Sequence, residues 1–285
     1  MGNGYVIYNP FSGDGKSKEN SKLLEMIFDE DLEYFDITKI TNYQTFFGGM
    51  AKEDYIIIAG GDGTLNHFIN DTEKIKIPQE IFYFPTGSGN DFAKDAGKTD
   101  GNPFRITEHL KNLPTVEVNG KKYRFINGVG FGMDGYCCEV GDKLKETSEK
   151  KVDYTKIAIK GLLFRFSPRN AKITVDGKEY LYKKVWIAPT MFGRYYGGGM
   201  MAAPAQNRWN GEGTLSLLLF HSAGRLRTLC IFPGIFKGKH IKHKKSVALH
   251  TGKEIEVEFD RPTPLQIDGE TICDVISYKV SSWQN

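Results

Sequence analysis

The sequence has few cysteines and no long hydrophobic run. Its four cysteines are Cys137, Cys138, Cys230 and Cys273. None has the CxxC or Cys/His spacing of a zinc site, so we expect free thiols in a reducing, cytoplasmic environment. The longest apolar stretch, 229–236, contains a proline and a glycine and falls far short of the roughly 20 residues that span a bilayer. The N-terminus also lacks the pattern of a signal peptide. We therefore expect a chain without a membrane-spanning segment.

Glycine, by contrast, is abundant, with 32 among 285 residues, whereas average usage is about 7%. No collagen period and no low-complexity run accompanies it, which excludes a fibre and a disordered chain. Fourteen of the glycines fall in five tight clusters, at 60–63, 87–89, 128–135, 197–199 and 211–213. The length suits one large or two ordinary domains with sizeable cores.

The net charge of +3 conceals two halves of opposite sign. Residues 1–118 hold 11 Lys and Arg against 19 Asp and Glu, a net charge of −8, whereas residues 119–285 hold 27 against 16, a net charge of +11. This asymmetry indicates two units with different partners, although composition drift is the plainer alternative. The basic half suits phosphate groups or an anionic membrane surface.

The front half alternates short apolar strands with helical patterns. We expect strands at 5–8, 34–37, 55–59 and 81–84, and helices at 17–29, 65–70 and 91–96. Repeated strand–turn–helix units predict a doubly wound α/β domain, whose sites lie at the carboxyl ends of its strands.

After about residue 114 the pattern changes to short runs in which apolar and polar residues alternate. Some of these runs are separated by turn pairs, such as Asn119-Gly120, that are typical of hairpins. Strands are expected at 115–118, 123–127, 171–175, 183–188, 215–220, 246–250 and 254–259. Helical insertions are expected at about 148–166 and 226–236. We assign residues 1–118 to the α/β domain and 119–285 to a β-sandwich domain with helical insertions, and leave open a return of the last residues to the first domain.

Glycine-bearing turns follow three of the expected parallel strands. They are 9–13 (Asn-Pro-Phe-Ser-Gly), 60–66 (Gly-Gly-Asp-Gly-Thr-Leu-Asn) and 85–92 (Pro-Thr-Gly-Ser-Gly-Asn-Asp-Phe). One such turn alone would indicate only a tight strand-to-helix connection. Three at one edge of a sheet fit a nucleoside triphosphate, because backbone N–H groups and helix N-termini bind phosphate. The chain has no Walker A motif, and no GxGxxG follows its first strand.

These motifs, in this order, resemble those of the diacylglycerol kinase catalytic-domain family, which includes bacterial soluble lipid kinases and has sphingosine and ceramide kinases as relatives. The rear half adds 127–132 (Asn-Gly-Val-Gly-Phe-Gly), the glycine hairpin at 196–200 and 267–270 (Ile-Asp-Gly-Glu). The resemblance runs from about residue 5 to residue 270. It implies an ATP-dependent lipid kinase of phospholipid metabolism, with diacylglycerol as the first candidate substrate and phosphatidic acid as its product.

The resemblance also implies which residues hold ATP and line the transfer site. The nucleotide contacts would be Asn9, Pro10, Ser12, Gly13, Thr41, Gly60, Gly61, Asp62, Gly63, Thr64, Asn66 and Thr86. Asn90 and Asp91 would line the site of phosphoryl transfer.

The general base would be Asp268 or Glu270. Phosphoryl transfer needs positioning, a divalent cation and a carboxylate that accepts the hydroxyl proton. On a strand these two side chains would point to opposite faces, whereas in a turn they could converge, so the choice stays open. Without the other motifs, Asp268-Gly269 would indicate only a hairpin turn.

Two positions depart from the family pattern. His67 stands where the family usually has Glu, and a titrating imidazole cannot replace a fixed carboxylate. Bacterial members of the family hold a structural magnesium in a segment that corresponds to residues 207–215. In this chain, Glu212 is the only acidic residue of that segment. Glu212 is therefore the one candidate ligand for such a metal, while Mg2+ is expected with ATP regardless.

The segment 237–245 combines five Lys with two His. It is either a solvated loop or an electrostatic contact with an anionic membrane surface. Nucleic acid is disfavoured because no aromatic-interleaved binding motif is present. We expect a cytoplasmic enzyme that associates peripherally with the membrane, and leave its oligomeric state open, a homodimer included.

Two alternatives stay open. An NAD-kinase-like small-molecule kinase would share the loop at 60–64 but not the motifs at 9–13 and 87–92 together. A non-catalytic lipid- or nucleotide-binding relative is suggested by His67 and by the lone acidic Glu212. Phosphorylation of NAD but of no lipid would favour the first, and lipid-dependent ATP consumption would exclude the second.

Overall fold

The computed structural model describes residues 2–12, 17–147 and 152–283. It forms two compact units, Met1–Leu113 and Pro114–Asn285. The boundary expected from the sequence lies after residue 118, at the far end of strand β6 (Thr115–Val118). Because β6 pairs with β17 (Glu270–Ser281) through the register Lys279↔Glu117, it belongs to the second unit from its first residue. Strand β17, the last strand of the chain's described part, also belongs to the second unit.

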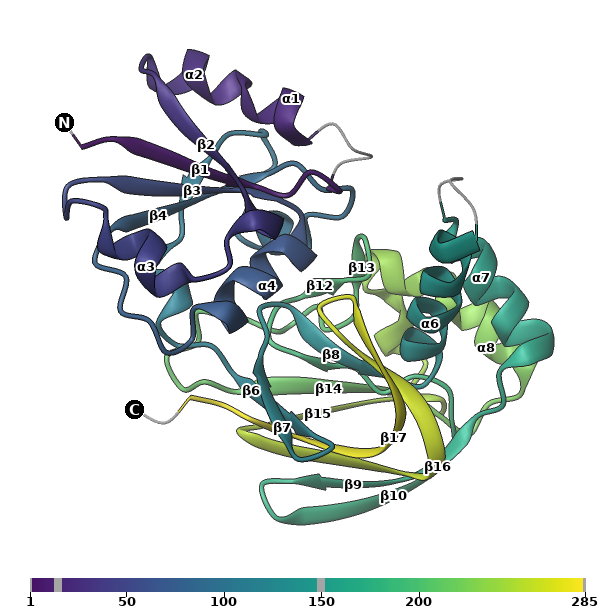
Figure 1. The fold of residues 1–285 in the computed structure, drawn as a ribbon. Helices are drawn as coiled ribbons and strands as arrows, with labels where there is room; N and C mark the ends of the chain where they lie inside the picture. The colour runs from purple at the N-terminus through teal and green to yellow at the C-terminus, as the bar shows by residue number, and fades with distance from the viewer. Residues whose placement is uncertain (1, 13–16, 148–151, 284–285) are drawn as a thin grey trace. The chain divides into compact units, whose positions relative to one another are not determined.

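The first unit is built on a five-stranded sheet (Figure 1). Its strands are β1 (Gly4–Tyr8), β2 (Leu32–Asp36), β3 (Tyr55–Gly60), β4 (Glu80–Pro85) and β5 (Phe104–Arg105). The strand order is β2-β1-β3-β4-β5, with β1 to β4 parallel and β5 antiparallel. The order reverses between β1 and β3, which creates the crevice where doubly wound sheets bind ligands.

Short helices connect these strands. They are α1 (Ser17–Ser21), α2 (Leu23–Phe28), η2 (Ile37–Lys39), α3 (Tyr43–Gly48), α4 (Asp62–Asp71), α5 (Asp91–Asp95) and η3 (Thr107–Leu110). The single helix expected at 17–29 is divided in two, between the buried residues Ser21 and Leu24. Strand β3 is buried from Ile56 onward, as the uniformly apolar sequence predicts for a strand covered on both faces.

The second unit has a sandwich-like β architecture, which confirms the expected fold class. Its further strands are β7 (Lys121–Arg124), β8 (Gly128–Phe131), β9 (Arg169–Val175), β10 (Lys178–Val185), β11 (Thr190–Met191), β14 (Leu215–Phe220), β15 (Val247–Gly252) and β16 (Glu254–Ile267). A separate hairpin is formed by β12 (Tyr195–Tyr196) and β13 (Met200–Met201). The long strand β16 pairs with β9 near its start and with β8 near its end, so it links two parts of the sheet.

The helices of this unit match the expected ones in part, since residues 225–237 are helical where a helix was expected at 226–236. They are α6 (Met133–Thr147), α7 (Tyr154–Lys160), the π-helical η4 (Gly161–Arg165), α8 (Arg225–Ile231), η5 (Phe232–Lys237) and η6 (Lys239–Lys242). The single helix expected at 148–166 was wrong in extent, and residues 148–151 lie outside the described part. No helix among the described residues is long and apolar enough to cross a membrane.

Helix α6 was missed because two glycines break its pattern. Each has a packing reason: a Cβ at Gly135 would lie 1.9 Å from the Pro264 carbonyl oxygen, and one at Gly141 would lie 2.6 Å from the Tyr154 ring. Glycine lowers helix propensity, yet here it allows close approach of α6 to β16 and to α7.

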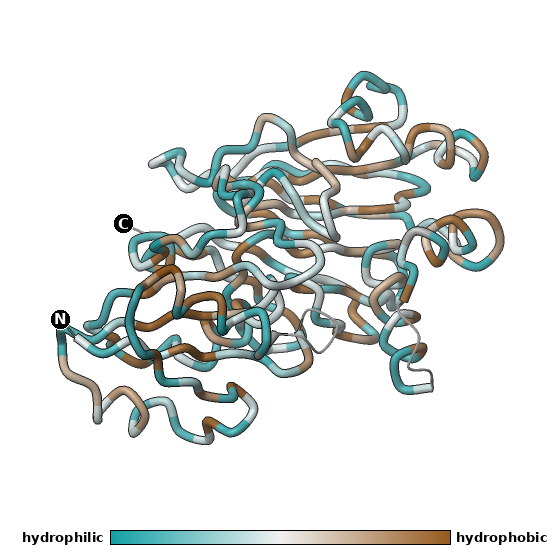
Figure 2. Tube along the Cα trace, turned by 90° about the horizontal axis from the view of Figure 1, so that it is seen from above, coloured by the Kyte–Doolittle hydropathy of each residue, from teal (hydrophilic) through white to brown (hydrophobic). Residues whose placement is uncertain are grey.

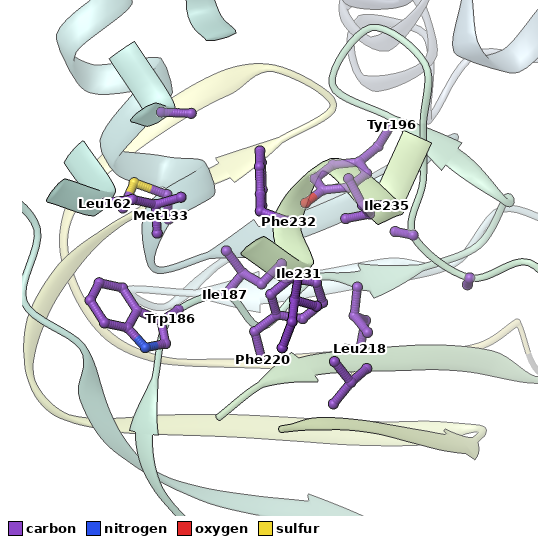
Figure 3. Close-up of a cluster of buried hydrophobic side chains, with 14 of the residues drawn as sticks. Met133, Leu162, Trp186, Ile187, Tyr196, Leu218, Phe220, Ile231, Phe232 and Ile235 are labelled. Carbon is purple, nitrogen blue, oxygen red and sulfur yellow. The ribbon is translucent and has the colours of Figure 1, made fainter. Parts of the chain in front are cut away.

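A hydrophobic core joins these helices to the sheet. Figure 3 shows Ile231 and Phe232 from the helices near Ile187 and Phe220, and Ile235 near Tyr196. All of these side chains are buried. One side of α8 and η5 is therefore fixed in the core.

Hydrophobic segments recur along the strands of the chain, whereas many of its outer turns are hydrophilic (Figure 2).

Candidate active site

Two glycine loops meet at the carboxyl ends of β3 and β4. The Thr86 N–H donates to the Gly60 carbonyl at 2.9 Å. A Cβ placed on Gly87 would come within 2.4 Å of the Gly61 Cα, so no other residue fits there without a shift of the backbone. Glycine is required at this point for close approach of the two loops.

Asp62 and Asn90 hold these loops in place. The Asp62 carboxylate accepts hydrogen bonds from the N–H groups of Asp91 (2.9 Å) and Phe92 (3.0 Å), and so caps the start of α5. Asn90 has a left-handed backbone, with φ of 47°. Its side chain turns back to accept from the Gly87 N–H at 3.0 Å and to donate to the Gly87 carbonyl at 2.9 Å. Both side chains, expected as nucleotide or transfer-site contacts, thus brace the loops.

The turn after β1 is tied to α4. The Asn9 side-chain amide donates to the Thr64 hydroxyl at 3.2 Å, and its oxygen accepts from the Phe11 N–H at 3.0 Å. The Ser12 N–H donates to the Asn9 carbonyl at 3.0 Å. A Cβ on Gly60 would lie 2.5 Å from the Thr64 side chain, so the three loops form one packed group.

The other expected nucleotide residues of the first unit lie on or beside these loops. Pro10 and Ser12 belong to the turn after β1, Gly63 and Asn66 to α4, and Thr86 to the loop after β4. Asp91, expected at the transfer site, belongs to α5. Gly13 lies outside the described residues. His67 is exposed on α4. The first turn of α4 begins at Gly61 without a side-chain cap, and such a helix N-terminus binds anions.

Thr41 lines a cavity of about 690 Å³. The cavity is lined by residues of β1, β2, α3 and the segment between β2 and α3, namely Tyr8, Tyr34, Phe35, Asp36, Lys39, Ile40, Thr41, Asn42, Thr45 and Phe46. The rings of Phe35 and Phe46 meet edge to face at 4.9 Å. This aromatic wall could not be predicted from the sequence, because aromatic residues at these positions are indistinguishable from core residues. Its aromatic lining suits the stacking of a flat heteroaromatic ring.

In the second unit, Asp268 and Glu270 occupy the turn between β16 and β17. The Asp268 carboxylate accepts three backbone N–H groups, from Ile126 (2.6 Å), Asn127 (2.8 Å) and Gly128 (2.9 Å). Glu270, at the start of β17, is exposed. The two candidate bases thus have different environments, because one is bound to the backbone and the other faces solvent.

Arg208 holds the same segment from its other side. This buried guanidinium donates to the Ile126 carbonyl at 2.8 Å and to the Asn127 side-chain oxygen at 3.1 Å. It also packs on the Phe192 ring, 5.3 Å from the centroid. This role of Arg208 could not be predicted from the sequence, because its partners are remote along the chain.

Glu212, the candidate ligand of a structural magnesium, is exposed. Residues 2–12, 17–147 and 152–283 contain no group of three or more His, Cys, Asp or Glu side chains that could hold a metal ion. The buried positive charge of Arg208 in the same segment also disfavours a cation. A structural magnesium at Glu212 therefore stays a prediction for which the described residues offer no donor set.

Asp134, on the first turn of α6, is a buried carboxylate that sequence analysis missed. Its Oδ1 accepts from the Tyr196 hydroxyl at 2.8 Å, and its Oδ2 has no hydrogen-bond partner within the described part of the chain. Burial raises the pKa of Asp134 from 3.8 to about 7, although the Tyr196 hydrogen bond opposes the shift. The only sequence signals were the glycine-rich run before Asp134 and the glycines after Tyr196.

Gln266 lies between Asp134 and the turn that carries Glu270. A Cβ on Gly130 would lie 2.8 Å from the Asp134 Cβ and 2.5 Å from the Gln266 amide nitrogen, so all three residues are in close contact. The Gln266 oxygen accepts from the Gly269 N–H at 2.7 Å. The Gln266 side chain therefore lies between the buried Asp134 carboxylate and the turn at 268–270.

Solved proteins share this fold. A Bacillus anthracis (strain Sterne) protein superposes with a TM-score of 0.70 at 22% identity, covering 99% of this chain and 92% of the other. A diacylglycerol kinase of the same organism superposes with a TM-score of 0.61 at 20% identity, covering 99% and 94%.

Curated relatives are more similar in sequence. A diacylglycerol kinase of Mycobacterium tuberculosis (strain ATCC 25618 / H37Rv) is 26% identical over 228 residues, which are 77% of this chain and 71% of the relative. A diacylglycerol kinase of Bacillus subtilis (strain 168) is 25% identical over 279 residues, which are 93% and 88%.

Family models match both units. The diacylglycerol kinase catalytic domain matches residues 3–120, and the YegS C-terminal NAD kinase beta sandwich-like domain matches residues 127–279. The second match alone covers more than half of the chain. Together with the glycine loops and the turn at 268–270, these matches show that the chain is a kinase and belongs to the diacylglycerol kinase catalytic-domain family.

Proposed function

We propose that this protein transfers the γ-phosphoryl group of MgATP to the free hydroxyl of diacylglycerol, giving phosphatidic acid. The observation that carries the proposal is the contrast between the two carboxylates of the turn at 268–270. Asp268 is held by three backbone N–H groups, whereas Glu270 is exposed at the start of β17. Only Glu270 combines a family motif position with access to a substrate.

ATP binds to the first unit in this proposal. The adenine enters the aromatic cavity beside Thr41, and the phosphates lie on the loops that follow β1, β3 and β4. Support comes from the close packing of Gly60, Gly61 and Gly87, which fixes the backbone of the two loops, and from the N-terminus of α4, which has no side-chain cap. Asp62 and Asn90 keep these loops rigid and contribute indirectly.

Glu270 is the general base. As the hydroxyl oxygen of the lipid forms its bond to the γ-phosphorus, the bond from that phosphorus to the β–γ bridging oxygen breaks and its electrons leave with ADP. The hydroxyl proton passes to the Glu270 carboxylate, a contribution of about 10²–10⁴-fold to the rate. Asp268 is a positioning residue, because its three N–H donors stabilise the ionised carboxylate and occupy the lone pairs that would otherwise accept the proton.

Magnesium arrives with ATP as part of the co-substrate. Both carboxylate oxygens of Asp62 accept backbone N–H groups, and the described residues provide no cluster of metal ligands. No step is therefore assigned to a metal held by the protein. The basic second unit supports peripheral association with an anionic membrane.

Radiolabelled ATP tests the proposal. The protein is incubated with a total lipid extract, with diacylglycerol in neutral detergent, and with NAD, and the labelled products are identified. We expect labelled phosphatidic acid, and we expect Glu270→Gln to reduce kcat by about 100-fold or more with the KM for ATP unchanged. Glu256→Gln, the same change at an exposed position of β16, should keep full activity. Labelled NADP without any labelled lipid would replace the proposal by the NAD-kinase alternative.

A further inference from the structure

The solvent side of α8 and η5 carries an unexpected row of apolar residues. Leu226, Cys230, Pro233 and Phe236 are exposed, Leu226 by 73% and Phe236 by 43%. Their spacings of four, three and three residues place them on one face, because an α-helix repeats every 3.6 residues and a 3₁₀-helix every three. We call these four residues the apolar stripe.

The apolar stripe lies opposite a firmly anchored face. Ile231, Phe232 and Ile235 of the same elements are buried in the core (Figure 3). At the start of α8, the Arg225 guanidinium donates to the carbonyls of Leu162 (2.9 Å) and Phe166 (2.8 Å), which ties α8 to η4. Since the scaffold is packed, the exposed apolar residues are not left over from a poorly formed helix.

All charged residues in the sequence around the apolar stripe are basic. Between Glu212 and Glu254 the sequence contains no acidic residue. The basic residues of this interval are Arg225, Arg227, Lys237, Lys239, Lys242, Lys244, Lys245 and Lys253. The five lysines of 237–245 are exposed and follow directly on Phe236. A basic segment thus continues the apolar stripe.

Neighbouring η4 has the same character. Phe164 is 74% exposed, and the interval 154–175 also contains no acidic residue. Arg165 directly follows Phe164. The hydrogen bonds from Arg225 place this element beside α8. Exposed apolar side chains and uncompensated positive charge therefore occur together on two adjoining elements.

We propose that the apolar stripe and the lysines of 237–245 form the surface by which this protein docks on an anionic phospholipid bilayer, with Leu226 and Phe236 entering the interface between headgroups and acyl chains. The inference rests on the proposed function, because a diacylglycerol kinase must reach a substrate that resides in a bilayer. Apolar residues beside basic ones are the composition that binds anionic membrane surfaces. A nucleic acid would require groups that stack on or read bases, and the stripe has aliphatic side chains and one phenyl ring instead.

Cosedimentation with vesicles tests the inference without ATP or turnover. The full chain is mixed with vesicles of phosphatidylcholine and phosphatidylglycerol, and with vesicles of phosphatidylcholine alone. We expect binding to the anionic vesicles that weakens strongly between about 0.1 M and about 0.5 M salt. Leu226→Ser with Phe236→Ser, and separately Lys242→Gln with Lys244→Gln and Lys245→Gln, should each lower the partition coefficient about tenfold or more.

Matched controls use exposed residues elsewhere in the same unit. Leu181→Ser, at a leucine that is 82% exposed, and Lys121→Gln with Lys122→Gln should bind like the wild type. Because Phe236 is less exposed than Leu226, Leu226→Ser alone is measured as well, so that a folding defect is not mistaken for lost binding. The inference would be overturned if the double serine variant and the triple glutamine variant both bound anionic vesicles like the wild type. Preferential binding of the basic segment to nucleic acid would also overturn it.

Turnover on diacylglycerol in neutral detergent micelles separates the two proposals. The stripe variants should retain that turnover while losing activity on anionic vesicles. A wild type that binds vesicles through the stripe but phosphorylates no lipid would refute the proposed function and still support the docking surface.

The exposed cysteines allow a second readout. Cys230 belongs to the stripe, whereas Cys273 lies exposed on β17. Burial raises the pKa of Cys138 to about 12 and raises that of Cys137 as well, which slows their labelling. An environment-sensitive fluorophore on Cys230, in Cys273→Ser, should shift to the blue with anionic vesicles. The same fluorophore on Cys273, in Cys230→Ser, should not, and equal shifts at both positions would contradict docking through the stripe.

Discussion

The Asp268 carboxylate accepts a 2.6 Å hydrogen bond from the backbone N–H of Ile126, a residue 142 positions earlier in the chain. Arg208 donates to the carbonyl of that same residue at 2.8 Å. A buried cation and a carboxylate thus hold one short segment from its two sides. Because Asp268 also forms the turn that leads to Glu270, the position of the proposed base depends on contacts that are remote in sequence.

Asp268→Asn should therefore lower mainly the stability of the protein, and Glu270→Gln mainly its turnover. An amide at 268 keeps only one oxygen and turns an NH2 group towards the backbone N–H donors, so the free energy of unfolding should fall by about 2–4 kcal/mol. Glu270→Gln removes an exposed carboxylate and should leave that free energy within about 0.5 kcal/mol of the wild type while abolishing most turnover. Denaturant titration and steady-state kinetics check both. An Asp268→Asn variant of normal stability without turnover would make Asp268 the base.

Gly87→Ala should impair nucleotide binding. The new methyl would meet the Gly61 Cα at 2.4 Å, so one of the two loops must move away from the other. We expect the Kd for ATP to rise about tenfold or more, because phosphate binding by backbone amides needs their fixed geometry. Calorimetric titration with ATP measures it. Gly48→Ala, at a position where a Cβ meets nothing within 4 Å, is the control and should bind ATP normally.

Thr41→Trp tests the aromatic cavity as the adenine site. Thr41 is exposed at the cavity wall, so an indole there should occupy the space without disturbing the core. The KM for ATP should rise about tenfold or more with kcat nearly unchanged, since the lost contacts hold the substrate and the transition state equally. Thr41→Ser keeps the hydroxyl and should leave the KM unaltered. Unchanged kinetics in Thr41→Trp would place the adenine elsewhere.

Local signals were enough to find the glycine loops. Gly60, Gly61 and Gly87 lie directly after strands whose apolar runs are legible in sequence, and parallel strands bring their carboxyl ends to one edge. The roles of Asp62 and Asn90 could not be predicted from the sequence. A carboxylate that caps a helix 29 positions away has the same local sequence as one that contacts phosphate.

Residues whose surroundings depend on long-range packing could not be found from the sequence. Asp134 is buried only because α6 packs against β16 at Gly135, and the two glycines that permit this packing hid the helix itself. The choice between Asp268 and Glu270 likewise needed the hydrogen bonds from 126–128. Periodicity and spacing describe neighbours along the chain, whereas these features depend on residues more than a hundred positions apart.

Asp134 should make stability depend on pH. Its pKa is about 7 in the folded protein against an ordinary value of 3.8, so the folded state binds the extra proton and ionisation opposes folding as pH rises towards 7. The free energy of unfolding of Asp134→Asn, relative to the wild type, should therefore increase by about 2–3 kcal/mol between about pH 5 and about pH 8. Denaturant titrations of both proteins across this range measure the difference, with Glu146→Gln, at an exposed position of α6, as the control. A constant difference between Asp134→Asn and the wild type would show that Asp134 is ionised, and thus better solvated or paired than its contacts with Tyr196 and Gly130 imply.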